Sequence, residues 1–316
     1  MNGNDETGPT TLRAEDLPEA ERPSIVLPEG GHCLFTVGAV GAGKSTLQHA
    51  VIHRLYTDER LALTMHGEET ETLDNQDLQE WIFKFDRGEF PNRTPRGRLQ
   101  KFYVRFGEHK RKRVELSFME ISGEHFEEIM GGEDGNGHGP RLNDELERVL
   151  ERTDVQKLFV FVSDATRHGG NADRHRTKEA REQALYEDML FSHLLQRLGE
   201  LDLKRIKVLF VAAKWDAASE RKTGPRRFFK RHFPGTRAML KQMHKADVKY
   251  IRYSIGKVRE EETENEGRRA HIDRRQTEPT ERIVQWIHTE ATGRRLKGYP
   301  SMHLTLWERI KTWVSA

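Results

Sequence analysis

One octapeptide near the N-terminus combines glycines, a lysine and a serine at a spacing that can bind phosphate. It reads Gly38-Ala39-Val40-Gly41-Ala42-Gly43-Lys44-Ser45, fits the pattern G-x-x-x-x-G-K-[ST], and is followed by Thr46. In such a loop the glycines let the backbone wrap closely round a phosphate, and backbone N–H groups with a helix N-terminus supply donors. Lys44 would neutralise the β- and γ-phosphates, and Ser45 would bind Mg²⁺. A glycine-rich turn with a purely structural role is the alternative interpretation. Such a turn gives no reason for Lys44, Ser45 and Thr46 to follow it.

A carboxylate is expected on the metal side of such a loop. The apolar segment 114–121 ends in Glu120-Ile121-Ser122-Gly123. An acid at this point can hold Mg²⁺ through water, and the glycine N–H can sense the γ-phosphate. Because Glu120 is one methylene longer than the usual Asp, the metal's ligand shell must shift or admit a water. A surface acid at the end of a strand is the alternative interpretation.

Two later segments bear on the choice of base. Ala213-Lys214-Trp215-Asp216 follows the apolar segment 207–212, and Ser254-Ile255-Gly256 follows the segment 248–253. Asp216 can accept hydrogen bonds from N1 and N2 of guanine, which adenine does not present, while the Lys214 stem packs over the ring. Loss of a paired, buried hydrogen bond discriminates strongly between ligands. A backbone N–H at Ser254 or Ile255 can then reach the guanine oxygen.

Apolar runs and helical spacing alternate along the chain around these motifs. Strands are predicted at 32–37, 100–106, 114–121, 157–162, 207–212 and 248–253, and helices at 45–56, 75–86, 142–151, 177–198, 226–233, 236–244 and 278–289. Alternation of this kind predicts an α/β fold, a P-loop NTPase-like three-layer sandwich whose mostly parallel central sheet has helices on both faces. Segments 100–106 and 114–121 are predicted to form a hairpin.

The ends and two internal runs depart from this pattern. Residues 1–30 hold seven acidic side chains, two arginines and four prolines, which predicts a disordered acidic tail. Residues 31–292 are predicted as one domain built around the phosphate loop, and 293–316 as an amphipathic helical extension. The glycine-rich run 131–140 and the charged run 259–275 are predicted to be mobile loops.

Composition narrows the class of protein and its partners. The 316 residues are 33% charged with a net charge of +2, and the single cysteine, Cys33, can form no intrachain disulfide. With no apolar run of about 18 residues and no basic-then-apolar N-terminus, a cytoplasmic protein is expected. The basic cluster at 221–231 favours a solvated helical face over nucleic acid binding, because acids are interspersed along the chain. Helix 303–314 could touch a membrane, but docking on its own domain or a partner is favoured.

The order of these motifs resembles the G1, G3, G4 and G5 boxes of TRAFAC-class GTPases, over roughly residues 32–290. Within that class the segment Phe90-Pro91-Asn92-Arg93-Thr94, the S-G-E after the hairpin and the A-K-W-D box resemble the bacterial double-GTPase proteins of conflict-associated gene clusters. The resemblance implies GTP or GDP as ligand, Mg²⁺ as cofactor, and a second GTPase or other protein as partner. It also implies that Thr94 is the switch I threonine that closes over Mg²⁺ and the γ-phosphate. A turn residue before Pro95 is the alternative for Thr94.

Several positions depart from the family pattern. Ala213 stands where the G4 box usually has an Asn that ties the box to the phosphate loop, so nucleotide affinity is expected to be reduced. Glu124, followed by His125, stands where Ras-like proteins have a water-orienting Gln, and either side chain could position water. The interval between Lys44 and Glu120 holds an extra predicted helix and indicates an enlarged switch I region. Slow or partner-activated hydrolysis is therefore expected.

The basic residues after segment 157–162 leave two alternatives open. Arg167, or an arginine beyond it, could act as an internal finger on the phosphates, whereas solvated residues on a long loop are the plainer reading. His138, His168 and His175 lack the paired spacing of a metal site and are interpreted as isolated surface histidines.

The leading hypothesis is a GTP-binding and GTP-hydrolysing molecular switch that depends on Mg²⁺ and regulates a partner protein. One alternative is a nucleotide-binding interaction module that hardly turns over, which the departures at Glu120, Ala213 and Glu124 would fit. The other is an ATP-using P-loop enzyme, which Asp216 disfavours.

Overall fold

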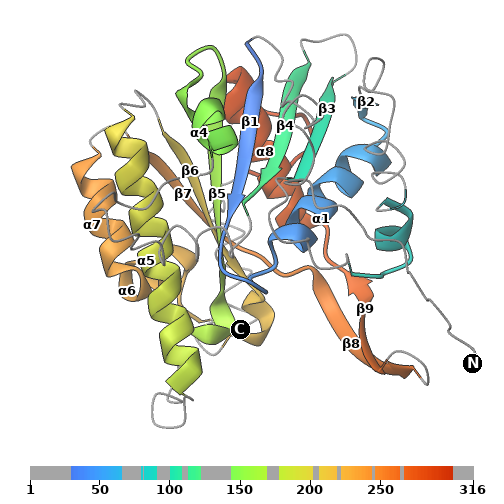
Figure 1. Ribbon diagram of the computed structural model, residues 1–316. Coiled ribbons are helices and arrows are strands. Elements are labelled where there is room, and N and C mark those ends of the chain that lie inside the picture. Colours follow the sequence, from blue (N-terminus) through green and yellow to red (C-terminus); the bar gives the residue numbers. More distant parts are fainter. Residues whose placement is uncertain are drawn as a thin grey trace, which may run out of the picture.

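A seven-stranded sheet forms the centre of the molecule (Figure 1). The computed structural model describes residues 30–65, 80, 82–90, 100–108, 113–121, 144–168, 178–201, 206–218, 222–243, 246–263 and 267–301. The strands are β1 (His32–Val37), β2 (Leu61–Met65), β3 (Gln100–Glu108), β4 (Val114–Glu120), β5 (Gln156–Asp164), β6 (Lys207–Ala213) and β7 (Asp247–Arg252). Their spatial order is β2-β3-β4-β1-β5-β6-β7. The pairs from β4 to β7 are parallel, and β3 is antiparallel to both β2 and β4.

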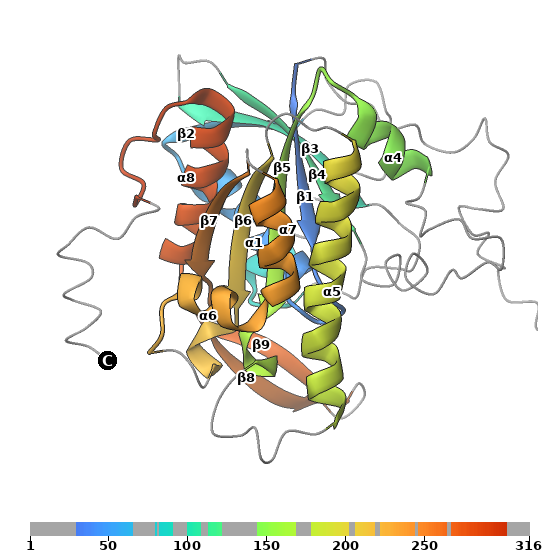
Figure 2. The ribbon, with the colours of Figure 1, turned by 90° about the vertical axis from the view of Figure 1, so that its left-hand side faces the viewer.

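Helices cover both faces of this sheet (Figure 2). One face carries α1 (Lys44–Thr57) and α8 (Glu278–Thr292), which pack on each other. The other carries α4 (Asp144–Glu151), α5 (Lys178–Glu200), α6 (Pro225–His232) and α7 (Pro234–Gln242). Short 3₁₀ turns, η3 (Ala165–Arg167) and η5 (Trp215–Ala217), follow β5 and β6. The predicted α/β sandwich with a mostly parallel sheet is therefore confirmed.

Strand β5 shows why the central strands are uninterrupted apolar runs. Leu158, Val160 and Val162 belong to the core beneath α1 and α8, whereas Phe159 and Phe161 belong to the core beneath α5. A strand covered on both faces must be apolar at every position, because alternate side chains point to opposite faces. Every predicted strand lies within two residues of its predicted bounds.

The sheet contains one strand that the sequence did not predict. β2 pairs antiparallel with β3 and places Leu61 opposite Glu108 at the edge of the sheet. β3 and β4 form the predicted hairpin, with Phe106 opposite Val114 next to the turn. Of the predicted helix at 75–86, the described residues 80 and 82–86 are helical. β2 is short, and nothing in its five residues distinguishes a strand from the end of the preceding helix.

The prediction of a mobile loop at 259–275 is wrong. The described residues of this run, 259–263 and 267–275, belong to an antiparallel hairpin of β8 (Gly256–Thr263) and β9 (Gly267–Arg275), which projects from one end of the sheet (Figure 1). Ile272 is 5% exposed and its N–H donates to Gly88 O at 2.8 Å. The Arg275 guanidinium lies 4.4 Å from the centre of the Phe85 ring. β9 is therefore held by the segment before the predicted switch I, despite its high charge.

Several predictions fall on residues that the structure does not describe. They are the tail at 1–29, the glycine-rich run 131–140 and the helix 303–314. Leu296 and Tyr299, in the segment between α8 and that helix, are buried in the core beneath α1. The three-part division of the chain stays a prediction. Among the described helices, none has both the length and the apolar character needed to cross a bilayer.

Candidate nucleotide-binding site

The octapeptide lies at the carboxyl edge of the parallel strands. It connects β1 to α1, and β1 lies between β4 and β5 in the sheet. The chain leaves β1 toward β4 on one side and later continues through β5 on the other, so the strand order reverses at β1. Ligands of open α/β sheets bind in the crevice at such a point. The ends of β4, β5, β6 and β7 lie along this same edge and bring the other predicted motifs to the loop.

Steric limits explain the glycines of this loop. A Cβ at Gly38 would lie 2.3 Å from the carbonyl oxygen of Val162 on β5, so only glycine fits there. Gly41 and Gly43 have φ of 74° and 96°, which disfavour any residue with a Cβ. The loop is thus shaped by its contact with β5 as well as by its own backbone.

Lys44 lies folded over the loop that precedes it. Its Nζ donates to Gly38 O at 2.9 Å and to Ala39 O at 3.2 Å, and the residue is only 6% exposed. The first turn of α1 contains no acidic residue. The helix therefore places no carboxylate of its own at the positive end of its dipole, which suits an anion-binding N-terminus.

Ser45 and Glu120 come together although 75 positions separate them in the sequence. Ser45 Oγ donates to Glu120 Oε1 at 2.9 Å, and Glu120 is 2% exposed at the end of β4. Behind them, buried Gln48 of α1 donates to Thr36 Oγ1 at 2.9 Å. A hydroxyl and a carboxylate are hard oxygen donors of the kind that Mg²⁺ prefers, so these two residues fit that ion. The extra methylene of Glu120 does not prevent its carboxylate from reaching Ser45.

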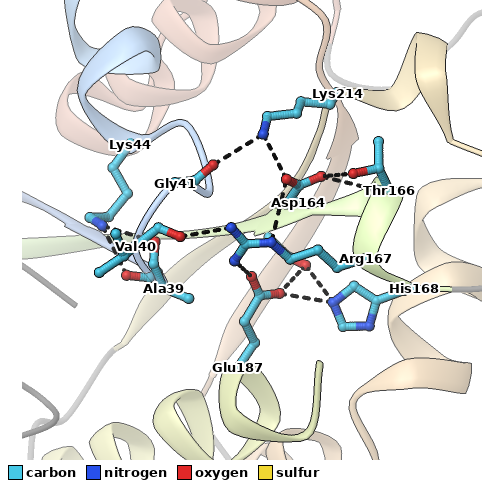
Figure 3. Close-up of polar contacts among 12 residues, drawn as sticks. Ala39, Val40, Gly41, Lys44, Asp164, Thr166, Arg167, His168, Glu187 and Lys214 are labelled. Atoms are coloured by element: carbon cyan, nitrogen blue, oxygen red, sulfur yellow. Dashed lines mark hydrogen bonds and ion pairs between the residues drawn. The ribbon is translucent and has the colours of Figure 1, made fainter. Parts of the chain in front are cut away.

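Lys214 links the A-K-W-D box to the phosphate loop. Its Nζ donates to Gly41 O at 3.2 Å and to Asp164 Oδ2 at 2.7 Å (Figure 3). Burial alone would raise the pKa of Asp164, but hydrogen bonds from Lys214 and Thr166 outweigh burial and lower that pKa. Asp164 is thus an anion at the end of β5 that fixes Lys214 against the loop.

Arg167 reaches the phosphate loop from η3. Its Nη2 donates to Val40 O at 2.8 Å, and its Nη1 lies 3.3 Å from Glu187 Oε1 on α5. Only 17% of the Arg167 side chain is exposed. The interpretation of Arg167 as a solvated loop residue is therefore wrong, and its guanidinium lies on the loop's backbone.

Glu187 is the centre of a buried polar cluster below Arg167. Ser163 Oγ donates to Glu187 Oε2 at 2.6 Å, and His168 Nε2 lies 2.8 Å from the same oxygen. Glu187, Ser163 and His168 are each at most 1% exposed. The interpretation of His168 as a surface histidine is wrong, because its ring also packs against Phe228 with centroids 5.4 Å apart.

The base-side motifs are adjacent but more open. Asp216 is exposed in η5, directly after Lys214, whose φ of 53° is left-handed. Trp215 N donates to Tyr253 O at 3.1 Å, which brings this turn beside Ser254. Ser254 Oγ accepts from Gly256 N at 3.3 Å. The structure therefore places the G4-like and G5-like segments side by side at the edge of the sheet.

Thr94 and Glu124 lie outside the described residues, as do the three histidines His125, His138 and His175. Sequence reasoning missed Asp164 and Glu187. Asp164 had a usable signal, because a carboxylate at the end of a mostly apolar strand is expected to have a specific partner. Glu187 had none, because its surroundings in the sequence read as an ordinary charged helix.

A mostly parallel sheet with a G-x-x-x-x-G-K-S loop between its central strand and the next helix defines a P-loop nucleotide-binding protein. The family model Double-GTPase 1 matches residues 35–292, which is most of the chain. The chain therefore belongs to the Double-GTPase 1 family. This membership supports GTP binding. No curated protein matched the chain.

Solved structures with similar folds are distant. One is the signal recognition particle receptor SRb-GTP/SRX complex of Chaetomium thermophilum, with a TM-score of 0.36 and 14% identity over 71% of this chain and 90% of that one. Roco2 RocCORdC of Methanosarcina barkeri, bound to GDP, has a TM-score of 0.34 and 13% identity over 91% of this chain and 56% of that one. Sup35 complexed with GDP has a TM-score of 0.28 and 16% identity over 75% of this chain and 41% of that one. This chain thus spans about half the length of the second and third.

Proposed function

We propose that this chain is a Mg²⁺-dependent GTPase switch, which hydrolyses GTP to GDP and phosphate and whose nucleotide state controls its contact with a partner protein or a second GTPase. The observation that carries the proposal is the 2.9 Å hydrogen bond between Ser45 Oγ and Glu120 Oε1. It joins the end of the phosphate loop to the carboxylate expected on the metal side.

The phosphate groups would be bound by the loop and by Lys44. Lys44 already lies against the loop carbonyls, so a short movement of its ammonium group would bring it to the β- and γ-phosphates. Backbone N–H groups of Gly41, Ala42 and Gly43 and the N-terminus of α1, including Thr46, would supply hydrogen-bond donors. These groups act on charge, which is the main way in which proteins catalyse phosphoryl transfer.

Ser45 and Glu120 would hold Mg²⁺, with Thr94 as a third ligand. When bound, the ion would supply positive charge that neutralises the charge developing on the phosphates. Ser45 would contribute its hydroxyl directly, and Glu120 would orient a water in the ion's shell.

Guanine would be recognised by Asp216 and by the segment after β7. Asp216 is exposed and can accept from both N1 and N2 of the base. Lys214, held by Asp164 and Gly41, would place its stem over the ring. Ser254 and Ile255 would offer backbone N–H groups to the guanine oxygen.

Hydrolysis requires attack of water on the γ-phosphorus and release of the β–γ bridging oxygen with GDP. Glu124 is the proposed water-positioning residue. Because Glu124 does not match the usual Gln, we expect slow turnover that a partner accelerates. The alternative is a nucleotide-binding module without turnover, which Ala213 in place of the usual Asn favours.

Single-turnover hydrolysis tests the proposal. GTP and ATP are offered in parallel, with and without Mg²⁺, to the wild type, Lys44→Ala and Asp216→Ala. We expect Mg²⁺-dependent GTP hydrolysis that Lys44→Ala abolishes, and loss of the preference for GTP in Asp216→Ala. Tight GTP binding without phosphate release would favour the interaction module. Equal use of ATP by the wild type would contradict the proposed role of Asp216.

A further inference from the structure

Four successive carbonyl groups of the phosphate loop each accept a hydrogen bond from a cationic side chain. Lys44 donates to Gly38 O and Ala39 O, Arg167 donates to Val40 O, and Lys214 donates to Gly41 O (Figure 3). Lys44 belongs to the phosphate-loop motif and Lys214 to the A-K-W-D box, whereas Arg167 belongs to neither of these motifs. Its contact therefore needs an explanation of its own.

A hydrogen bond to Val40 O fixes more than one atom. The peptide bond is planar, and no cis peptide bond occurs among the described residues, so the Val40 C=O and the Gly41 N–H point in opposite directions. Gly41, with φ of 74°, is conformationally permissive, and an untethered peptide on its N-terminal side could flip. Arg167 thus determines the direction of the Gly41 N–H, which points away from the guanidinium.

The guanidinium is fully engaged in this contact. Its three nitrogens lie against three groups: Nη2 on Val40 O at 2.8 Å, Nη1 on Glu187 Oε1 at 3.3 Å and Nε on Asp164 Oδ2 at 3.5 Å. The two positive charges of Arg167 and Lys214 are balanced by the carboxylates of Asp164 and Glu187, so these four residues add little net charge to the phosphate site. This geometry fits a residue that orients the loop rather than one that contacts phosphate.

Glu187 gives the guanidinium a rigid support. Its carboxylate is fully buried and is also bonded by Ser163 of β5 and by His168. A fully satisfied buried network holds its members in one arrangement. Arg167 is therefore anchored to the sheet and to α5 while it contacts the loop.

We propose that Arg167 is a positioning residue for nucleotide binding, which, supported by Glu187, orients the Val40–Gly41 peptide so that the Gly41 N–H faces the β-phosphate. With Lys214 on the next carbonyl, it supplies the tie to the phosphate loop that Ala213 cannot make. This inference rests on the proposed function, because it assumes that the loop binds a guanine nucleotide.

Competition against a fluorescent N-methylanthraniloyl-GDP tests the inference by giving dissociation constants for GDP and GMP. A charge-assisted hydrogen bond contributes about 1.5–3 kcal/mol, so Arg167→Met should weaken GDP binding by roughly ten- to a hundredfold. GMP lacks the β-phosphate, so the affinity of Arg167→Met for GMP should fall by less than about threefold. The GDP-over-GMP ratio therefore falls. Arg167→Lys, which keeps one donor for Val40 O, should give an intermediate ratio.

Arg197→Met is the matched control, because Arg197 also pairs with two carboxylates, Glu147 and Glu200, but away from the loop. It should leave the ratio unchanged. Melting temperatures without nucleotide show whether each variant is folded. If Arg167→Met does not fold, the ratio measured for Arg167→Lys decides the test. An unchanged ratio in folded Arg167 variants, with the wild type binding GDP, overturns the inference alone. A wild type that binds neither GDP nor GMP overturns the proposed function as well.

Discussion

The phosphate side and the base side of the candidate site differ in how firmly the fold holds them. On the phosphate side, Lys44 is 6% exposed and Glu120 is 2% exposed. On the base side, half of the Lys214 side chain is exposed and Asp216 is exposed. The phosphate loop is thus built into the core, whereas the residues expected to choose the base lie at the surface.

This difference indicates a division of labour. Buried polar groups are costly to leave unpaired, so a loop held by buried partners stays in one arrangement before a ligand arrives. Exposed side chains such as Asp216 exchange water for a ligand at little cost to the fold. Substitutions on the phosphate side should therefore change stability and binding together. On the base side, substitution of Asp216 should change specificity alone, whereas Lys214 also contacts the loop.

The largest effect is expected for Glu187→Gln. The substitution leaves the Arg167 guanidinium buried without its charged partner on α5. Removing one member of a buried ion pair costs about 3–5 kcal/mol, so the free energy of unfolding in urea should fall by about 3 kcal/mol.

Glu200→Gln is the matched control on the same helix. Glu200 pairs with Arg197, and both side chains are more than a third exposed. Surface pairs contribute roughly 0–1 kcal/mol, so this variant should unfold much as the wild type does. Equal losses in the two variants would mean that the cluster around Glu187 is not a firm support, and the contrast between the two sides would disappear.

Gly38→Ala should have the next largest effect. Its Cβ would lie 2.3 Å from Val162 O, a backbone atom of the central strand β5 that cannot easily move. Forcing extra atoms into a packed site costs about 1–3 kcal/mol. The loop would also shift, so GDP affinity should fall in parallel with stability.

Gly199→Ala provides the comparison for Gly38→Ala. Nothing lies within 4 Å of a Cβ at Gly199, which belongs to α5. Alanine exceeds glycine in helix propensity by up to about 1 kcal/mol, so this variant should be slightly more stable and bind GDP normally. A stable Gly38→Ala that binds GDP as the wild type does would show that the loop is not fixed by β5.

The sequence predicted the phosphate side well where chemistry and burial coincide. β1, β5 and β6 consist mainly of consecutive apolar residues, and such runs have few alternatives to a buried strand. The loop motif follows the first of these strands directly, so its place at the carboxyl edge of the sheet could be expected. The order of the boxes then predicted which strand ends meet there.

What the sequence could not predict depends on contacts between distant segments. Glu187 lies in a helix rich in charge, and only packing shows that its carboxylate is buried with Ser163 and His168. The hairpin β8–β9 is charged on both strands, and its contact through Ile272 with the segment 82–89 is visible only in three dimensions. In both cases charge in the sequence suggested solvent, whereas tertiary pairing determined the structure.

Lys214→Ala should have a smaller effect that involves both sides. It removes the donor to Gly41 O and the main cation on Asp164. Because the Lys214 side chain is half exposed, we expect a loss of about 1 kcal/mol in unfolding free energy and roughly tenfold weaker GDP binding. Lys241→Ala, at an exposed position on α7, should change neither. A double-mutant cycle with Asp164→Asn should give non-additive losses, and additive losses would show that the pair does not act as a unit.

The smallest effect is expected in the pH dependence of stability. The folded pKa of Asp164 is lowered, because hydrogen bonds from Lys214 and Thr166 outweigh the effect of burial. A lowered folded pKa means that the unfolded chain binds the proton more tightly. The stability that the carboxylate contributes is therefore present above its unfolded pKa, near about 3.9, and is lost as the pH falls through the folded value.

Urea unfolding between pH 7 and pH 3 measures this contribution. The difference in unfolding free energy between the wild type and Asp164→Asn should be constant at neutral pH and shrink below about pH 4, where the wild-type carboxylate begins to protonate. Asp154→Asn is the control, because Asp154 also has a lowered pKa but pairs with Arg152 at the surface, where the contribution is small. A difference for Asp164→Asn that does not change with pH would mean that its charge does not hold Lys214. The contact between Lys214 and Gly41 O would then hold without support from the Asp164 charge, and the link between the two sides would rest on that hydrogen bond alone.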